Sequence, residues 1–185
     1  MKKRIAIFAS GKGSNAKAII DYFKNNETVA ITMIASNNPN AGVLAIARQN
    51  NIDTFTFSKE DLQNEDFFLK QLSNIDFIVL AGFLWLIPSF LVKQFPNRII
   101  NIHPALLPKF GGKGMYGMRV HEAVHQAKET ETGITIHFVN EHYDEGIYIL
   151  QQKINIDAND TPTSIAAKVL LLEHHWYPKA IEQIL

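Results

Sequence analysis

The sequence has 185 residues, 46% of them apolar, with 18 basic and 18 acidic side chains. Its length predicts one domain over residues 1–185 with a core of its own, and its zero net charge gives no basis for expecting a nucleic acid or a membrane as a partner. The absence of cysteine excludes disulfides, thiolate metal ligands and cysteine nucleophiles. No apolar run approaches the ~20 residues of a membrane-spanning helix, so we expect a cytoplasmic protein. The composition leaves the oligomeric state open.

Strand-like and helix-like segments alternate over roughly the first hundred residues. Strands are expected at 4–9, 29–35, 75–80 and 98–102. Helical spacing covers 14–24 and 59–72, apolar residues from Val43 to Ile52 continue the alternation, and 84–95 reads as a loop leading into a short helix. This order is typical of a doubly wound, mainly parallel, Rossmann-like sheet.

The pattern changes after Pro108. A glycine-rich, flexible segment covers 110–117, and a helix is expected over 119–128. Residues 135–139 and 147–154 predict two strands of an antiparallel hairpin. A long closing helix follows over 163–185, with Asp160 or Thr161 as its cap and Pro162 in its first turn. The expected class is therefore α/β, a mainly parallel sheet with an antiparallel C-terminal hairpin and a closing helix.

The first motif is Gly11-Lys12-Gly13-Ser14-Asn15-Ala16, which follows the first strand. Glycines allow a ligand to approach the backbone, and a helix N-terminus offers free N–H groups to an anion. A nicotinamide dinucleotide would also require an acidic residue at the end of the second strand. That end reads Ser36-Asn37-Asn38, so a phosphate site is favoured, with a tight turn that binds nothing as the alternative.

The second motif is His121-Glu122-Ala123-Val124-His125, which matches the zinc-peptidase pattern His-Glu-x-x-His. Such a site needs a third ligand, usually from a later helix. The next candidates, Glu141, His142 and Glu145, fall in the hairpin region. We therefore expect two ordinary histidines on a half-exposed helix and no metal site.

The third motif is the apolar strand and proline-rich exit from Ile99 to Pro108. Asn101 and His103 stand at i, i+2, so their side chains point to the same side at the carboxyl end of the strand. An asparagine amide can stabilise an oxyanion and a histidine can carry a proton near neutral pH. Asp144, on a turn between two later strands, is the candidate carboxylate. Together they indicate acyl-type transfer or hydrolysis through a tetrahedral intermediate.

Several segments now resemble the folate-dependent formyltransferases. The Asn-x-His-Pro block is shared across that family, and the Gly-Ser-Asn loop is typical of the members that formylate glycinamide ribonucleotide in purine biosynthesis. The resemblance runs over about residues 4–180. Its segments are Ser10-Gly11-Lys12-Gly13-Ser14-Asn15, Ala81-Gly82-Phe83, Asn101 to Pro108, His137-Phe138-Val139 and Asp144-Glu145-Gly146.

The resemblance implies roles for individual residues. Asn101 would polarise the formyl oxygen, His103 would move a proton, and Asp144 would raise the pKa of His103. Glu173 would contact the glycinamide portion. The phosphate would be held by Gly13, Ser14 and Asn15. The pterin of 10-formyltetrahydrofolate, the implied cosubstrate, would lie against Leu84, Trp85, Leu86, Ile87, Asn101, Asn140, Glu141, His142, Tyr143 and Asp144. No metal is implied.

The sequence also departs from the family pattern. The loop over 110–118 is glycine-rich and longer, Trp85 stands where other members often carry a basic residue, and no basic folate contact is evident at 64–66. Leu170 replaces a common polar residue. These changes leave the exact folate and substrate contacts open. The alternatives are a 10-formyltetrahydrofolate hydrolase, a formyltransferase with another amine acceptor, a methionyl-tRNA formyltransferase, and a ligand-binding regulator without turnover.

Overall fold

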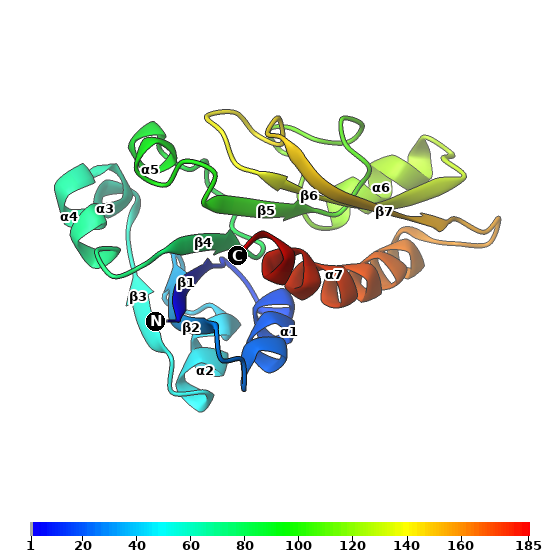
Figure 1. Cartoon of the computed structure of the whole chain (residues 1–185). Helices are drawn as coiled ribbons and strands as arrows, with labels where there is room; N and C mark the ends of the chain where they lie inside the picture. The colour runs from blue at the N-terminus through cyan, green and yellow to red at the C-terminus, as the bar shows by residue number, and fades with distance from the viewer. Residues whose placement is uncertain (1) are drawn as a thin grey trace.

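A computed structural model describes residues 2–185, which form one seven-stranded sheet with helices on its two faces (Figure 1). The strands are β1 (Lys3–Phe8), β2 (Val29–Ser36), β3 (Asp53–Thr56), β4 (Phe77–Leu80), β5 (Ile99–His103), β6 (Glu131–Phe138) and β7 (Tyr148–Asn155). The helices are α1 (Ser14–Phe23), α2 (Gly42–Gln49), α3 (Lys59–Gln63), α4 (Glu65–Gln71), α5 (Ser89–Gln94), α6 (Met118–Gln126) and α7 (Pro162–Ile184).

The strand order is β3-β2-β1-β4-β5-β6-β7. All pairs from β3 to β5 are parallel, and β6 and β7 are added antiparallel. The predicted fold class, a mainly parallel sheet with an antiparallel C-terminal hairpin and a closing helix, is confirmed. Within the described residues, no helix is both long and apolar enough to span a bilayer.

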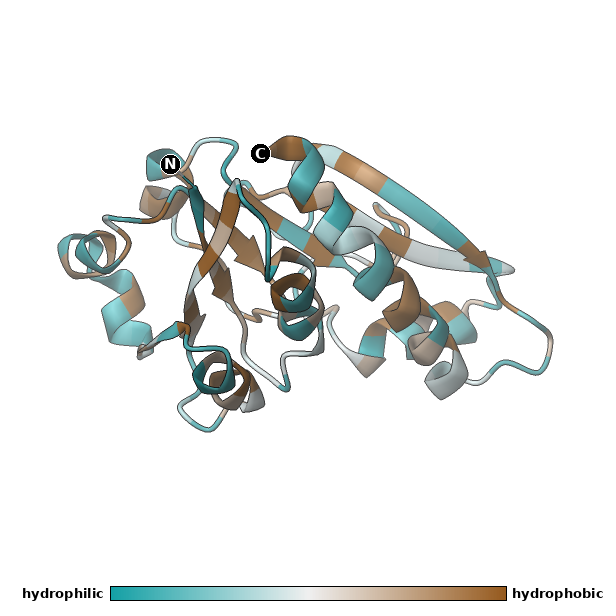
Figure 2. Ribbon diagram, turned by 60° about the horizontal axis from the view of Figure 1, so that its bottom comes forward, coloured by the Kyte–Doolittle hydropathy of each residue, from teal (hydrophilic) through white to brown (hydrophobic). Residues whose placement is uncertain are grey.

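Alternating side chains along the central strands build two separate cores. In β1, Ile5 and Ile7 face the layer of α1, α2 and α7, whereas Ala6 and Phe8 face the layer of α3, α4 and α5. Both sets are buried because helices cover both faces, as expected for parallel strands. Figure 2 shows the result as hydrophobic central strands beneath helices whose outer faces are hydrophilic.

Three elements differ from the sequence-based expectation by more than two residues. The helix expected over 59–72 is two short helices, because Asn64 ends α3 and its side chain caps α4 by accepting a hydrogen bond from the Phe67 N–H at 3.1 Å. Strand β3 was missed because it lies at the sheet edge and lacks a buried alternating face. Strand β6 begins at Glu131 instead of Thr135. Gly133 lies inside it, where a Cβ would come within 1.8 Å of the Gln152 carbonyl oxygen.

The closing helix α7 is attached to the strands that carry the candidate site. Thr161 is its N-cap in a capping box with Ser164, and Pro162 opens the first turn. Deeper in the helix, the fully buried Tyr177 hydroxyl donates to the Leu80 carbonyl oxygen at 2.8 Å and lies 3.3 Å from that of Ile100. Tyr177 therefore connects α7 to the carboxyl-terminal part of β4 and to β5.

We predict that Tyr177→Phe lowers the free energy of unfolding by about 1–3 kcal/mol, because it removes a buried hydrogen-bond donor from carbonyl groups that water cannot reach. Urea denaturation would show a lower midpoint with an unchanged slope. Tyr22→Phe is the matched control, since the Tyr22 hydroxyl bonds Glu182 at the surface and its loss should cost less than about 0.5 kcal/mol. Equal midpoints for Tyr177→Phe and the unmodified protein would contradict the prediction.

Candidate active site

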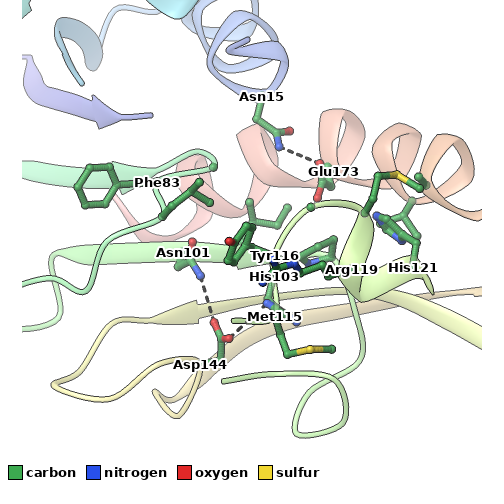
Figure 3. A pocket seen from close by; sticks show the side chains of 18 of the residues that line it. Asn15, Phe83, Asn101, His103, Met115, Tyr116, Arg119, His121, Asp144 and Glu173 are labelled. Carbon is green, nitrogen blue, oxygen red and sulfur yellow. Dashed lines mark hydrogen bonds and ion pairs between the residues drawn. The ribbon is translucent and has the colours of Figure 1, made fainter. Parts of the chain in front are cut away.

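The main cavity lies where the strand order reverses. The chain leaves β1 toward β2 on one side and returns as β4 on the other, so a crevice opens at the carboxyl ends of these strands. A cavity of about 810 Å³ occupies this edge. It is lined by residues that follow β1 and β4, by the end of β5, by one side of α7, by the segment 112–121 and by Tyr143 and Asp144 (Figure 3).

The N-terminus of α1 forms one end of the cavity. Gly13 precedes the helix with φ of +83°, and a Cβ there would lie 2.7 Å from the Val43 side chain, so only glycine fits. Within residues 2–185 no side chain caps the helix, and its first turn carries no acidic residue. Gly13 is buried, Ser14 is exposed, and Lys12 and Asn15 line the cavity. The free N–H groups and Lys12 favour an anion here.

Asn15 and Glu173 connect this end of the cavity to α7. Asn15 Nδ2 donates to Glu173 Oε2 at 2.8 Å, as Figure 3 shows. Asn15 Oδ1 is buried and has no hydrogen-bond partner among the described residues. Burial raises the pKa of Glu173 to about 7, although the hydrogen bond from Asn15 opposes the shift. Glu173 therefore titrates near neutral pH and can donate or accept a hydrogen bond inside the cavity.

We predict that Glu173→Gln makes the stability of the protein less sensitive to pH. The pKa of Glu173 rises from 4.5 to about 7 on folding. The contribution of the protonated Glu173 side chain to the free energy of unfolding is therefore fully present below pH 4.5 and is lost as the pH rises through about 7. Over this window the native protein should lose on the order of 3 kcal/mol relative to the variant. The test is urea unfolding of both proteins at pH 4.5 and pH 8. A stability difference that is the same at both pH values would contradict the prediction.

Asn101, His103 and Asp144 meet at the end of β5. Asp144 Oδ2 lies 3.4 Å from His103 Nδ1 and accepts from the Gly112 N–H at 2.9 Å. Asp144 Oδ1 lies 3.4 Å from Asn101 Nδ2. The structure thus brings together the three residues that the sequence analysis selected, and Asp144 contacts both of the others.

The pKa of His103 is lowered, because burial outweighs the opposing effects of the Asp144 carboxylate and the Phe110 carbonyl. The expectation that Asp144 raises this pKa thus describes one contribution and not the net direction. The Phe110 carbonyl can only accept, so His103 Nε2, at 2.8 Å from it, carries a proton. Burial raises the pKa of Asp144, but the opposing effects of its polar neighbours, the Gly112 N–H among them, outweigh burial, so this pKa is lowered. Asp144 is therefore a carboxylate at neutral pH.

A buried network missed by the sequence analysis holds the loop after His103. Thr135 Oγ1 donates to the Ala105 carbonyl at 2.8 Å and accepts from the Leu107 N–H at 3.0 Å. Gln151 Nε2 donates to the Leu107 carbonyl and to Thr135 Oγ1, both at 2.9 Å. The alternation of polar and apolar residues in β6 and β7 was the available signal. The partners of these side chains are backbone groups, which the sequence does not reveal.

A second, small cavity of about 40 Å³ lies on the other side of Asn101 and Asp144. Of the expected pterin contacts, Trp85, Leu86, Ile87, His142 and Tyr143 line this cavity, together with Asn101 and Asp144. Leu84 lines the main cavity instead. Asn140 accepts from the His142 N–H at 2.9 Å, and Glu141 is exposed. The structure thus brings most of this set together and leaves Asn140 and Glu141 outside the cavity lining.

The His-Glu-x-x-His motif lies on α6. His121 is buried and lines the main cavity, whereas Glu122 and His125 are exposed. The two imidazoles therefore have different surroundings. Residues 2–185 contain no group of three or more side chains placed to hold a metal ion.

Comparisons with known proteins show the family and the fold. The formyl transferase family model matches residues 3–181. The chain is 40% identical to phosphoribosylglycinamide formyltransferase, chloroplastic, of Arabidopsis thaliana, over 99% of this chain and 65% of that protein, so it spans about two thirds of that relative's length. It is 36% identical to phosphoribosylglycinamide formyltransferase of Bacillus subtilis (strain 168), over 99% and 95% of the two chains. A crystal structure of glycinamide ribonucleotide transformylase 1 from Geobacillus kaustophilus superimposes with a TM-score of 0.90 at 32% identity and covers both chains completely.

Proposed function

The chain belongs to the formyl transferase family, as its sequence motifs predict, and from that premise we propose that it transfers the formyl group of 10-formyltetrahydrofolate to the amine of glycinamide ribonucleotide. This acceptor is the phosphoribosylglycinamide in the names of the relatives, and the reaction belongs to purine biosynthesis. One observation carries the proposal: the Asn101–His103–Asp144 cluster shares a cavity with an uncapped helix N-terminus. The cavity thus offers a phosphate site and an acyl-transfer site together.

The two cavities suggest how the substrates are arranged. The ribonucleotide phosphate fits the N-terminus of α1 beside Lys12, with the rest of the ribonucleotide along Asn15 and Glu173. The folate fits the small cavity beside Trp85 and Ile87. Asn101 and Asp144 line both cavities. The formyl carbon would therefore meet the amine beside these residues.

The proposed reaction is direct attack of the amine on the formyl carbon. The new C–N bond forms as the carbonyl becomes an oxyanion, which an N–H of Asn101 and the Nε2–H of His103 stabilise. Collapse of this intermediate breaks the bond to the folate nitrogen, which receives the proton given up by the attacking amine. His103 Nε2–H donates to the Phe110 carbonyl in the structure, so this carbonyl has to move before His103 reaches the formyl oxygen.

The test is a formyl-transfer assay with the purified protein. 10-Formyltetrahydrofolate is mixed with or without glycinamide ribonucleotide, and release of the deformylated folate is followed by absorbance. Release only in the presence of the ribonucleotide is the expected result. Release without it would indicate a hydrolase, and no release in either reaction would require another amine acceptor or a protein that only binds. The cytoplasmic location stays a prediction, since the Arabidopsis relative is named as chloroplastic.

A further inference from the structure

We propose that His137 is a positioning residue for Asn101: as a neutral ring protonated on Nδ1, it accepts a hydrogen bond from the Asn101 amide and directs the second N–H of that amide toward the formyl oxygen. The inference rests on the proposed function. It concerns a residue that lines the small cavity where the folate is placed and that lies directly behind the Asn101 amide.

The sheet places the two residues opposite one another. Asn101 of β5 pairs with His137 of β6 in the antiparallel ladder, so their side chains lie on the same face. The His137 side chain is 2% exposed. Its Nε2 lies 3.3 Å from Asn101 Nδ2. Burial and cross-strand pairing therefore hold the His137 ring against the Asn101 amide.

The protonation of the His137 ring follows from its other contact. Nδ1 lies 2.9 Å from the Phe138 carbonyl oxygen, which can only accept, so Nδ1 carries a proton. In the neutral ring Nε2 is then an unprotonated acceptor. Nε2 is also 3.6 Å from Asp144 Oδ1, a separation too long for a hydrogen bond between them. Both groups thus present lone pairs to the same nitrogen, Asn101 Nδ2.

This arrangement fixes the orientation of the Asn101 amide. Two acceptors on one side require the amide nitrogen, and not its oxygen, to face them. The atoms Nδ2, His137 Nε2 and Asp144 Oδ1 form a triangle with sides of 3.3, 3.4 and 3.6 Å. The two acceptors are thus about 65° apart as seen from Nδ2, whereas the two N–H bonds of a planar amide diverge by about 120°. One N–H can point at the pair, and the other is left for the formyl oxygen.

The backbone around His137 supports this geometry. The β6–β7 register shifts between Ile136 and His137, and Gly146 closes against the Phe138 carbonyl. A Cβ at Gly146 would come within 1.6 Å of that carbonyl oxygen and 3.3 Å of His137 Nδ1. Glycine at 146 therefore allows the β6–β7 hairpin to pack over the contact between His137 Nδ1 and the Phe138 carbonyl, which places the ring proton on Nδ1.

The first experiment is a mutant cycle on formyl transfer. His137→Leu removes the acceptor and should lower kcat about 10-fold, with the KM for glycinamide ribonucleotide changed less than about twofold. His137→Gln, whose side-chain oxygen can accept in place of Nε2, should recover most of the rate. In an Asn101→Ala background, His137→Leu should have no further effect on kcat. An equal loss of rate in both backgrounds would mean that His137 acts only structurally and would overturn the proposal.

The second experiment needs no activity. Long-range ¹H–¹⁵N correlation spectra of the unliganded native protein, with the His137 signals assigned by their loss in His137→Gln, should show a proton on Nδ1 and a bare Nε2. A proton on Nε2, in either the other tautomer or the imidazolium, would overturn the proposal even if His137→Leu fails to fold. Absence of formyl transfer by the native protein would instead refute the proposed function, and the spectrum would still decide the hydrogen-bond arrangement.

Discussion

His103→Ala is expected to lower kcat for formyl transfer roughly 100- to 10,000-fold, the range typical for loss of a positioned acid–base group. The imidazole presents a protonated Nε2, which bonds the Phe110 carbonyl, and its Nδ1 lies 3.4 Å from the Asp144 carboxylate. An alanine leaves the reacting oxygen without this donor, and the nearby Asn101 cannot supply a proton. Binding of the ribonucleotide should persist, because the uncapped N-terminus of α1 is untouched.

The measurement is kcat under saturating substrates, together with the affinity for glycinamide ribonucleotide by calorimetry. His125→Ala is the matched control, since His125 is an exposed histidine on α6, and its removal should change kcat less than about twofold. His103 is buried, so a urea unfolding curve must show that the variant is folded. Near-normal turnover by a folded His103→Ala protein would rule out the role given to this histidine.

The sequence was sufficient to predict Asn101 and His103 as a pair. Both stand at the end of an apolar strand with the two-residue spacing that places side chains on one face, and the structure has them there. Asp144 is a different case, because it lies 43 residues from Asn101. It was selected as a carboxylate on a turn and from the family resemblance, since spacing alone does not determine which hairpin lies beside β5.

The features that could not be predicted depend on backbone groups and on register. The Phe110 carbonyl and the Gly112 N–H contact the site, and every residue type except proline offers both groups. The pairing of Asn101 with His137 depends on the β5–β6 register, which a polar-apolar pattern alone does not fix to one residue. The lowered pKa of His103 depends on how much the fold buries it. In each case the missing information is three-dimensional.

Asp144→Asn is the second large-effect variant, and it should lower kcat by roughly 100- to 10,000-fold. The carboxylate accepts on both sides: Oδ2 faces the Gly112 N–H and His103, while Oδ1 faces the Asn101 amide nitrogen. An asparagine has one acceptor and one donor, so whichever way its amide is turned, an N–H faces another donor. Either the Gly112 N–H or the Asn101 amide therefore loses its acceptor. In both orientations the negative charge that favours a protonated His103 is also lost, although the side chain keeps nearly the same size.

The backbone should not change in this variant. Asp144 has φ of +58°, and asparagine tolerates that left-handed conformation as readily as aspartate does. A loss of rate can therefore be assigned to the side-chain chemistry. Glu145→Gln neutralises the adjacent, exposed carboxylate and should leave kcat within about twofold, which controls for a general effect of charge. If Asp144→Asn were to reduce kcat no more than Glu145→Gln does, neither His103 nor Asn101 would depend on this carboxylate in catalysis. The proposed reaction would then need another group to orient these two side chains.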